Sequence, residues 1–521
     1  MSLVISRGPA VFLTQVGLLT TASLAVLGCV QADPLDEPVE AHADAIFAHD
    51  FGHDEAGAAA DDASFTSREI TRGFEYPMRI VWGPDNTLWL TERTGKRVVR
   101  VRPEDGVRTT AITISEVYQA GGQDGLLALV LHPDLLKGKG RDYVYVSYTY
   151  DADPGTAVDR RTKIRRYTYN PATKTLGSPF DLITGLPGSD DHNSARLLFG
   201  PDQKLYYTIG DQGNNQFGRK CIPIRAQALP TKAQVAAQDW STYVGKVLRL
   251  NLDGSIPHDN PRIDGVRSHV YSYGHRNPQG LTFGRDGKLY ANEHGPKTDD
   301  ELNLIKPGKN YGWPHVAGYR DNQAYTYDNW SASSPTPCEE LAWNDYQAPP
   351  SVPQQEESTF NHPDFTEPLH TFFTVDDDYQ FFDPACGFLQ YICWPTIAPS
   401  SLHYYPTEGH GGHGGHGGHG GHGGHGGHGI RGWGNSLLMT TLKAGALYRV
   451  KLSPNGKSVV GEPAVLFKTV NRYRDLAWSP DRRTLYIITD TAGNSSDQNG
   501  GATTALENPG ALLEFKYTGA H

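Results

Sequence analysis

Short apolar runs alternate with turn residues along the chain from about Gly73 onwards. The recurring unit is an apolar strand, a Pro-Asp or Asp-Gly turn, and a second strand with aromatic residues; Pro and Asp are favoured in tight turns. A weaker copy that lacks the Pro-Asp turn, LLMTTLKAGALYRVKL, begins at Leu437. The clear copies are MRIVWGPDNTLWLTER from Met78, LLALVLHPD from Leu126, RLLFGPDQKLYYTIGD from Arg196, QGLTFGRDGKLYANEHG from Gln279 and RDLAWSPDRRTLYIITD from Arg474.

These repeats predict an all-β fold, a six-bladed β-propeller of four-stranded antiparallel blades, because radial repetition of short strands leaves few exposed edges. Further strands after some copies, such as IRRYTYN at Ile164, help to complete a blade. The composition agrees: 27 Tyr, 18 Phe, 9 Trp, 58 Gly and 35 Pro suit short strands and turns, and 3 Met accompany few helix-forming stretches. A β-sandwich or two barrels is the alternative, which the recurrent turns disfavour.

Two segments within the predicted propeller domain, residues 68–521, do not follow the repeat. Residues 324–384 are Pro-rich and acidic, and we expect a surface excursion between blades. Residues 409–429 contain only Gly and His, with seven histidines at every third position. Such a composition cannot form a core, so it predicts a flexible loop. The loop is either a transient site for zinc, nickel or copper or a bare spacer.

The first 32 residues have the pattern of an export signal, with a sparse positive start and an apolar stretch from Val11 to Leu27. Cleavage at VLGC would leave Cys29 to carry a lipid, and cleavage after Ala32 would release a soluble protein; a retained membrane span is the third reading. Residues 33–67 lack a periodic apolar pattern and predict a flexible tether. We therefore expect a periplasmic, envelope-anchored or secreted protein.

The charge balance excludes one class of partner. Against 47 Lys and Arg the chain has 58 Asp and Glu, which gives a formal charge of −11 over 521 residues. No run of Lys or Arg interrupts this balance, so the sequence does not indicate a nucleic-acid-binding protein.

The stretch DHNSARLLFGPDQKLYYTIGDQGNNQ, residues 191–216, contains the strongest candidate chemistry. Its two strand-like runs, 195–199 and 205–209, predict a hairpin that brings His192 and Asp211 to the same rim of a sheet. A carboxylate beside an imidazole fixes the tautomer of the ring and makes it a better base. The alternative is that both are ordinary turn residues.

Other polar residues occupy equivalent positions, just before the first strand or just after the second strand of a blade, where propeller loops meet at one end of the central channel. Several cations converging on one polar cavity would repel one another, so they indicate an anionic ligand with several carboxylates. The residues at these positions are Gln123, His192, Asp211, Arg276, Asn277, Gly295, Pro296, Lys443, Arg472 and Arg474.

Long motifs spread over about residues 74–517 carry a family resemblance. In addition to the stretch at residues 191–216, these motifs are GKVLRLNLDGSIP, GHRNPQGL, HGPKTDDELNLI, NYGWPHVAGY, CGFLQYICWPTIAPSS, NRYRD and ALENPG. With them the chain resembles the soluble pyrroloquinoline-quinone (PQQ)-dependent glucose dehydrogenases, six-bladed propellers that oxidise aldose sugars.

The resemblance implies oxidation of an aldose at C1 to the lactone, with electrons passed on to a soluble or membrane-associated acceptor. It makes His192 the general base, Asp211 its orienting carboxylate and Arg276 the residue that stabilises charge on the quinone. The residues implied at the sugar or quinone rim are Gln123, Asp191 and Gln216, with Tyr391 and Trp394 as the aromatic wall. The residues implied to bind the cofactor are Arg276, Asn277, Thr396, Lys443, Arg472 and Arg474.

The resemblance also implies calcium. The carbonyls of Gly295 and Pro296 would bind one Ca²⁺ beside the cofactor, an ion that prefers oxygen ligands and acts as a Lewis acid. Two structural Ca²⁺ near a dimer interface are implied at Glu301, Tyr311, Ala317, Tyr319, Asp321 and Glu357.

Some residues depart from the family pattern. His294 stands where Gln is expected and Phe217 where a smaller aliphatic residue is usual, while Cys221 and Cys338 look like additions. The preferred sugar therefore stays open. One rival function is a metal-dependent lactone or ester hydrolase, which would require carboxylates at the propeller axis where this chain has Arg and Lys. Another is a non-enzymatic sugar-binding or adhesion propeller.

The four cysteines after residue 32 can pair in an oxidising compartment. A Cys386–Cys393 bridge would close a small loop and hold the aromatic wall; the alternative is two unpaired buried thiols. A Cys221–Cys338 bridge would pin the excursion over the active face, although a sequence cannot show connectivity.

Overall fold

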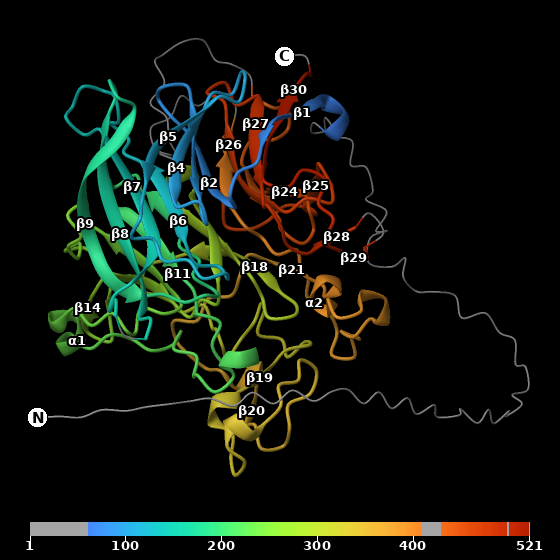
Figure 1. The fold of residues 1–521 in the computed structure, drawn as a ribbon. Helices are drawn as coiled ribbons and strands as arrows, with labels where there is room; N and C mark the ends of the chain where they lie inside the picture. Colours follow the sequence, from blue (N-terminus) through green and yellow to red (C-terminus); the bar gives the residue numbers. More distant parts are fainter. Residues whose placement is uncertain (1–60, 156, 408–428, 498–499, 520–521) are drawn as a thin grey trace, which may run out of the picture. The chain divides into compact units, whose positions relative to one another are not determined.

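Six antiparallel sheets of four strands each form a six-bladed β-propeller, which confirms the predicted fold (Figure 1). The structure is a computed structural model and describes residues 61–155, 157–407, 429–497 and 500–519. The described residues belong to one compact unit that begins at Gly57. None of the helices in this described part is long and apolar enough to cross a membrane.

The first three blades follow one another along the chain. Blade 1 contains β2 (Pro77–Trp82), β3 (Leu88–Glu92), β4 (Arg97–Val101) and β5 (Arg108–Thr113). Blade 2 contains β6 (Leu126–Leu131), β7 (Tyr143–Asp151), β8 (Arg160–Asn170) and β9 (Thr175–Pro187). Blade 3 contains β10 (Leu197–Phe199), β11 (Leu205–Ile209), β12 (Lys246–Leu250) and β15 (Val270–Tyr273).

The last three blades carry the insertions. Blade 4 contains β16 (Pro278–Phe283), β17 (Leu289–Glu293), β18 (Asp300–Ile305) and β21 (His370–Phe372). Blade 5 contains β22 (His403–Tyr405), β23 (Ser436–Thr440), β24 (Leu447–Lys451) and β25 (Ala464–Leu466). Blade 6 contains β26 (Tyr473–Trp478), β27 (Thr484–Thr489), β30 (Ala511–Tyr517) and, outermost, β1 (Phe65–Arg72).

Smaller elements lie between these strands. Among the described residues, three two-stranded sheets pair β13 (Arg262–Ile263) with β14 (Val266–Arg267), β19 (Thr326–Asp328) with β20 (Gln354–Glu356), and β28 (Ser495–Ser496) with β29 (Ala502–Thr503). The α-helices are α1 (Lys232–Ala237) and α2 (Gln390–Cys393).

The blades form a closed ring. The innermost strands β2, β6, β10, β16 and β22 contact one another in sequence, blade 5 contacts β26 through β23, and β26 contacts β2. The apolar core lies between neighbouring blades, as where Tyr145 of blade 2 packs with Leu197 and Tyr207 of blade 3. At the inner end of each blade this arrangement leaves loops that can meet around the central channel.

The recurrent turn explains why the inner strands are so regular. In blade 1 the Gly83 amide donates to the Thr87 carbonyl at 2.7 Å, and in blade 3 the Gly200 amide donates to the Lys204 carbonyl at 2.9 Å. One residue of each turn is left-handed, as in Gln203 with φ 61°. The Pro-Asp signal thus marks the connection between the first and second strands of a blade.

The start of the propeller and both ends of the excursion differ from the expected bounds. β1 begins at Phe65 and pairs with β30, so the last residues of the expected tether belong to blade 6. β21 lies inside the expected excursion as the outer strand of blade 4, so residues 306–369 leave the blade between its third and fourth strands. A three-residue strand such as β21, with no Pro-Asp turn beside it, carries too little alternation for its pattern to be recognised.

The weak repeat at Leu437 is also corrected. It forms the second and third strands of blade 5, β23 and β24, and the inner strand β22 precedes it. The Pro-Asp turn is missing because the connection from β22 to β23 contains the Gly/His tract. The expectations for that tract fall on residues 408–428, which lie outside the described residues, as do those for the export signal and Cys29.

Candidate active site

A polar cavity of about 1080 Å³ opens among the loops that precede the inner strands and follow the second strands. It is lined by most of the residues that the sequence predicts for sugar and cofactor: Gln123, Asp191, His192, Gln216, Arg276, Gly295, Pro296, Tyr391, Trp394, Thr396, Lys443, Arg472 and Arg474. Asp211 lies behind His192. Asn277 does not line the cavity, and its Oδ1 accepts from Ser194 at 2.9 Å.

His192 and Asp211 meet at the rim of blade 3, where the hairpin of β10 and β11 brings them together. Nδ1 of His192 lies 2.6 Å from Oδ1 of Asp211. The ring is largely buried, and its Nε2 is on the side of Asp191, 3.8 Å from Oδ1 of that carboxylate. With Nδ1 donating to Asp211, the lone pair of Nε2 is available to accept a proton from a ligand in the cavity.

Asp211 is held ionised by its neighbours. Oδ2 accepts from Trp313 Nε1 at 2.8 Å, and Oδ1 accepts from the Gly213 amide at 2.9 Å. Burial alone would raise the pKa of Asp211, but the His192 imidazole and the Arg276 guanidinium outweigh it, so that the pKa lies below its usual value. An ionised Asp211 fixes the tautomer that a base at His192 requires.

The backbone around His192 is unusual. His192, Ser194 and Ala195 all have positive φ, at 42°, 54° and 61°. A Cβ on Gly210 would come within 2.1 Å of the His192 carbonyl, so only glycine fits between the two strand ends. Backbone strain of this kind is typical of functional sites.

One wall of the cavity is an amide–carboxylate cluster. Asp191 accepts from Gln123 Nε2 at 2.5 Å and from Gln216 Nε2 at 3.4 Å. Gln216 in turn accepts from Nη2 of Arg276 at 3.4 Å. These groups give several hydrogen-bonding partners to a polyhydroxy ligand beside His192.

Arg276 is another residue that lines the cavity. Its guanidinium lies 5.3 Å from the centroid of the Trp313 ring, and Nη1 donates to the His294 carbonyl at 3.2 Å. Its buried Nε has no hydrogen-bond partner in the described structure. The residue lines the cavity, so the charge of its guanidinium can attract an anionic ligand.

Lys443 also lines the cavity. Its ammonium donates to the Tyr391 carbonyl at 3.3 Å, to the Trp394 carbonyl and to the Thr396 hydroxyl. Burial lowers the pKa of Lys443, and the charge of Asp300 opposes this effect. The lysine is therefore fixed in place before any ligand binds.

Arg472 and Arg474 share one carboxylate. Nε of Arg472 lies 3.0 Å and Nη2 of Arg474 2.7 Å from Oδ2 of Asp490. Burial opposes ionisation of Asp490, but the two guanidinium groups lower its pKa below the usual value. Because one carboxylate serves two arginines, one positive charge stays unbalanced at this wall, as an anionic ligand requires.

A second, very small cavity of about 10 Å³ lies beside the first. Gly295, Pro296, Glu301, Tyr311 and Ala317 line it together with Glu293. Burial and the charge of Glu293 raise the pKa of Glu301 well above its usual value. A buried carboxylate pair around a space for one atom fits a bound cation.

Tyr319, Asp321 and Glu357 do not line that cavity. Glu357 accepts from the amides of Ala317 and Asn322 at 2.9 and 3.0 Å, so it lies at the loop that contains Tyr319 and Asp321. Burial raises the pKa of Glu357 to about 8, and Asp321 and Asp299 contribute to this rise. Glu357, Asp321 and Asp299 thus form a second group of neighbouring carboxylates at this loop.

Sequence comparison identifies the family. The model of the glucose/sorbosone dehydrogenases matches residues 74–360. A quinoprotein glucose dehydrogenase B of Acinetobacter calcoaceticus is 46% identical over 463 residues, which are 88% of this chain and 92% of that protein. The chain belongs to the glucose/sorbosone dehydrogenase family.

Two further relatives are more distant. An aldose sugar dehydrogenase of Escherichia coli is 32% identical over 46% of this chain and 59% of its own length. The PQQ-bound aldose sugar dehydrogenase of Streptomyces coelicolor shares the fold, with a TM-score of 0.55 and 23% identity over 88% of this chain and 99% of that one.

Several residues of this family member's cavity were missed by the sequence reasoning. Arg93 lines the cavity and directly follows β3, the same position in its blade that identified the other residues. Asp300 lines it too, and its Oδ2 accepts from the amides of Ile397 and Ala398 at 2.7 Å. Asp490, which directly follows β27, occupies the same position, whereas no local pattern shows that Trp313 contacts Asp211.

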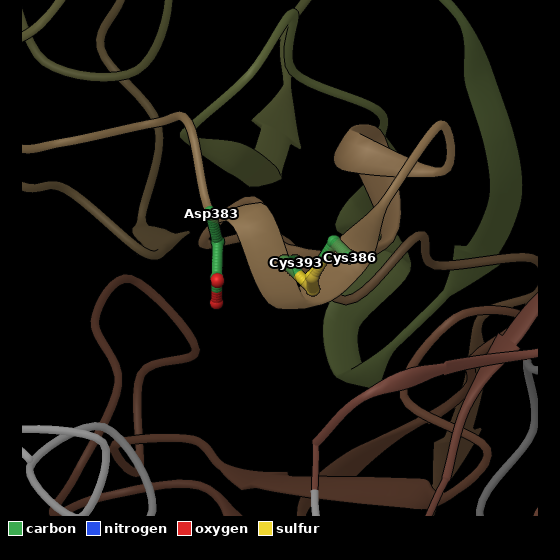
Figure 2. A group of neighbouring side chains, drawn as sticks. All are labelled: Asp383, Cys386 and Cys393. Carbon is green, nitrogen blue, oxygen red and sulfur yellow. A yellow bond between two sulfur atoms is a disulfide. The ribbon is translucent and has the colours of Figure 1, made fainter. Parts of the chain in front are cut away.

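Both disulfides are present. Cys386–Cys393 confirms the expected bridge, and Figure 2 shows it beside Asp383. Because the two sulfurs are bonded to each other, this trio offers no thiolate to a metal. Cys221–Cys338 joins a blade 3 loop to the excursion.

Proposed function

We propose that the protein oxidises an aldose at C1 to the lactone, with PQQ as cofactor and His192 as the general base. The observation that carries this proposal is the His192–Asp211 pair, 2.6 Å apart, at the edge of a cation-lined cavity. Family membership makes the protein a sugar dehydrogenase, and the names of its relatives support PQQ and an aldose or glucose.

The chain's own residues fit a polycarboxylate cofactor. Lys443, Arg472 and Arg474 would bind its carboxylates, with Thr396 beside Lys443 and the Arg276 guanidinium near its reactive side. When bound, PQQ would supply the two-electron acceptor that takes the hydride from C1. These cations also disfavour a lactonase-like hydrolase, which would need carboxylates at the axis.

The protein side chains would orient the sugar and accept its proton. Asp191, Gln123 and Gln216 would orient the sugar hydroxyls through the hydrogen-bond network they form. Nε2 of His192 would accept the proton of the anomeric hydroxyl, and Asp211 would stabilise the resulting imidazolium. Tyr391 and Trp394 would cover the apolar face of the ring.

Calcium is the proposed metal. The carbonyls of Gly295 and Pro296 would hold one ion near the cofactor, and the carboxylate clusters at Glu301 and at Glu357 would hold structural ions. The unbalanced buried carboxylates support this, because a cation would remove the cost of ionising them.

Reconstitution tests the proposal. Purified protein is incubated with PQQ and Ca²⁺, and reduction of an artificial dye is followed with a panel of aldoses. We expect sugar-dependent reduction that requires both additions and is severely reduced in His192→Ala. Binding of sugars without any dye reduction would instead indicate a sugar-binding propeller.

We also propose that the protein is exported. Its two disulfides support an oxidising compartment, because such bonds are rare in the cytosol. Fractionation of cells, with mass spectrometry of the mature N-terminus, would test export and distinguish lipidation of Cys29 from cleavage after Ala32. Recovery of the protein in the cytosol with its first residues intact would refute it.

A further inference from the structure

The segment that lines one part of the cavity mouth is acidic throughout. No Lys or Arg stands between Arg320 and Arg431, whereas Asp and Glu recur along this stretch. Asp376, Asp377 and Asp378 are all exposed, and Asp377 lines the cavity. No hydrogen bond or ion pair joins the carboxylates of Asp376 and Asp378 to another described residue. The cavity is therefore cationic inside and acidic along this part of its mouth.

Exposed aromatic rings gather in the same segment. Tyr346, Phe382, Phe388 and Tyr391 have exposed fractions of 43%, 59%, 91% and 44%. The rings of Tyr346 and Phe382 are in contact, with a centroid distance of 5.9 Å, and Tyr346 and Tyr391 line the cavity. Together with the two unpaired carboxylates these rings form an acidic–aromatic patch, whose residues are Tyr346, Asp376, Asp378, Phe382, Phe388 and Tyr391.

The chain holds the most exposed ring of this patch at the surface. Phe388 lies in the loop that the Cys386–Cys393 bridge closes. The side chain of Gln390 accepts from the Asp383 amide at 2.8 Å and donates to the Asp383 carbonyl at 2.7 Å, which ties the loop to the residues before it. Exposed apolar surface rimmed by polar groups marks an interaction site.

The same loop reaches the residues that are proposed to bind the cofactor. The Lys443 ammonium donates to the carbonyls of Tyr391 and Trp394. A partner bound to the patch would therefore lie close to the cavity that is proposed to hold the quinone. Proximity matters here, because the rate of electron transfer falls steeply with the separation of the two redox centres.

The proposed reaction requires an acceptor at this mouth. Oxidation of one aldose to its lactone leaves two electrons and two protons on the reduced cofactor. Before the next sugar can react, two one-electron acceptors must take one electron each, and the two protons must pass to water.

We propose that the acidic–aromatic patch is the docking surface for a small one-electron redox protein with a basic face around its prosthetic group. This inference rests on the proposed function. The carboxylates would steer and orient a basic partner, and the aromatic rings would form the small apolar contact that transient electron-transfer complexes use. The carboxylates disfavour a membrane surface, because anionic lipids repel them.

Binding of cytochrome c tests the patch without turnover. Oxidised cytochrome c is the basic one-electron probe, and cytochrome c with succinylated lysines is its acidic counterpart. Calorimetry at low ionic strength, on the protein incubated with PQQ and Ca²⁺ and without sugar, should detect binding of the native probe only. We expect Asp376→Asn/Asp378→Asn and, separately, Phe388→Ser to weaken this binding about tenfold each.

Matched controls separate the patch from the overall negative charge. Glu104→Gln/Asp264→Asn removes the same charge from two exposed residues. Both lie in connections between the third and fourth strands of their blades, at the end away from the cavity. Phe180→Ser is the control for Phe388→Ser, because Phe180 is exposed on β9 and does not line the cavity. Neither control should change the affinity for cytochrome c by more than about twofold.

Several outcomes would overturn the docking surface. These are no binding by the wild-type protein, equal binding of native and succinylated cytochrome c, and patch variants that are folded by circular dichroism yet bind no more weakly than their controls. Phe388-dependent binding to vesicles of phosphatidylcholine and phosphatidylglycerol, without binding of cytochrome c, would replace the protein partner with a membrane.

Turnover separates this inference from the proposed function. With an aldose present, reduction of cytochrome c should fall about tenfold in both patch variants, in parallel with the affinity, while reduction of a small dye stays at the wild-type rate. If no aldose drives dye reduction, the proposed function fails, and the binding measurements still decide whether the patch binds a basic redox protein.

Discussion

The substitution Asp211→Asn examines how the base is held. Asp211 accepts from His192 Nδ1 at 2.6 Å and the Gly213 amide on one oxygen, and from Trp313 Nε1 at 2.8 Å on the other. Asparagine has one acceptor oxygen and a donor NH₂. With its oxygen toward His192, the NH₂ opposes the Trp313 N–H, a buried conflict that costs about 1–3 kcal/mol. In the reverse orientation the amide donates to Nδ1, and the proton then occupies Nε2.

Either orientation weakens the base. When the amide donates to Nδ1, Nε2 is protonated and has no lone pair; when the amide oxygen faces His192, the conflict with Trp313 disturbs the hydrogen bond between His192 and residue 211. A positioned general base contributes about 10²–10⁴-fold, so we expect kcat to fall within that range while KM for the sugar changes far less. Dye-reduction kinetics measure both constants, and the absorbance of bound quinone shows that the cofactor is retained.

A double variant tests whether the Trp313 N–H donor causes the loss of activity in Asp211→Asn. Asp211→Asn/Trp313→Phe removes the opposing donor and keeps an aromatic ring beneath Arg276, so the amide oxygen can face His192 and about tenfold in kcat should return. Trp313→Phe alone is the control. A kcat within about threefold of wild type in Asp211→Asn would refute the carboxylate's role, and a double variant no more active than the single would refute the donor conflict.

Three further predictions concern the cofactor, the metal and the disulfide. Lys443→Met should weaken quinone binding about 10–100-fold, as loss of a charge-assisted bond implies; a change confined to the sugar KM would contradict the assignment. Burial raises the pKa of Asp299 to about 7 and of Glu357 to about 8. Without metal, these two carboxyl groups therefore keep their protons in the folded protein, whereas the unfolded chain releases them above about pH 4. After chelation the melting temperature should therefore fall as pH rises from about 5 to 8, with calcium abolishing the fall; a flat profile would argue against the structural sites. Cys386→Ser/Cys393→Ser should lower the free energy of unfolding by roughly 2–3 kcal/mol in denaturant titrations. It should also weaken quinone binding, because Lys443 donates hydrogen bonds to the Tyr391 and Trp394 carbonyls in the loop that the disulfide closes. An unaltered quinone affinity would show that this loop does not position Lys443.

The inner strands could be predicted from the sequence because their signal is local. An apolar run, a Pro-Asp turn and an aromatic run define β10 and β11 as clearly as they define β2 and β3. β21, the outer strand of blade 4, and β22, the inner strand of blade 5, could not, since neither is followed by a Pro-Asp turn and their place depends on pairing across long insertions.

In the candidate site, too, local arrangements could be predicted from the sequence and long-range contacts could not. His192 and Asp211 belong to one hairpin, so a sequence pattern could place them together. The sharing of Asp490 by two arginines could not be read, because it depends on how β26 and β27 turn their ends toward the cavity. The contact of Phe217 with Trp343 was likewise invisible, since it depends on a disulfide that spans 117 residues.

The pairing of β1 with β30 governs when the molecule can become complete. Phe65 lies opposite Tyr517 in this sheet, so the strand that closes blade 6 comes from the other end of the chain. Contacts of such sequence separation form slowly, because closing the loop costs entropy before any burial repays it. A nascent chain that lacks β30 leaves β1 and the edge of β27 unpaired, and blade 6 stays incomplete until synthesis has passed Tyr517.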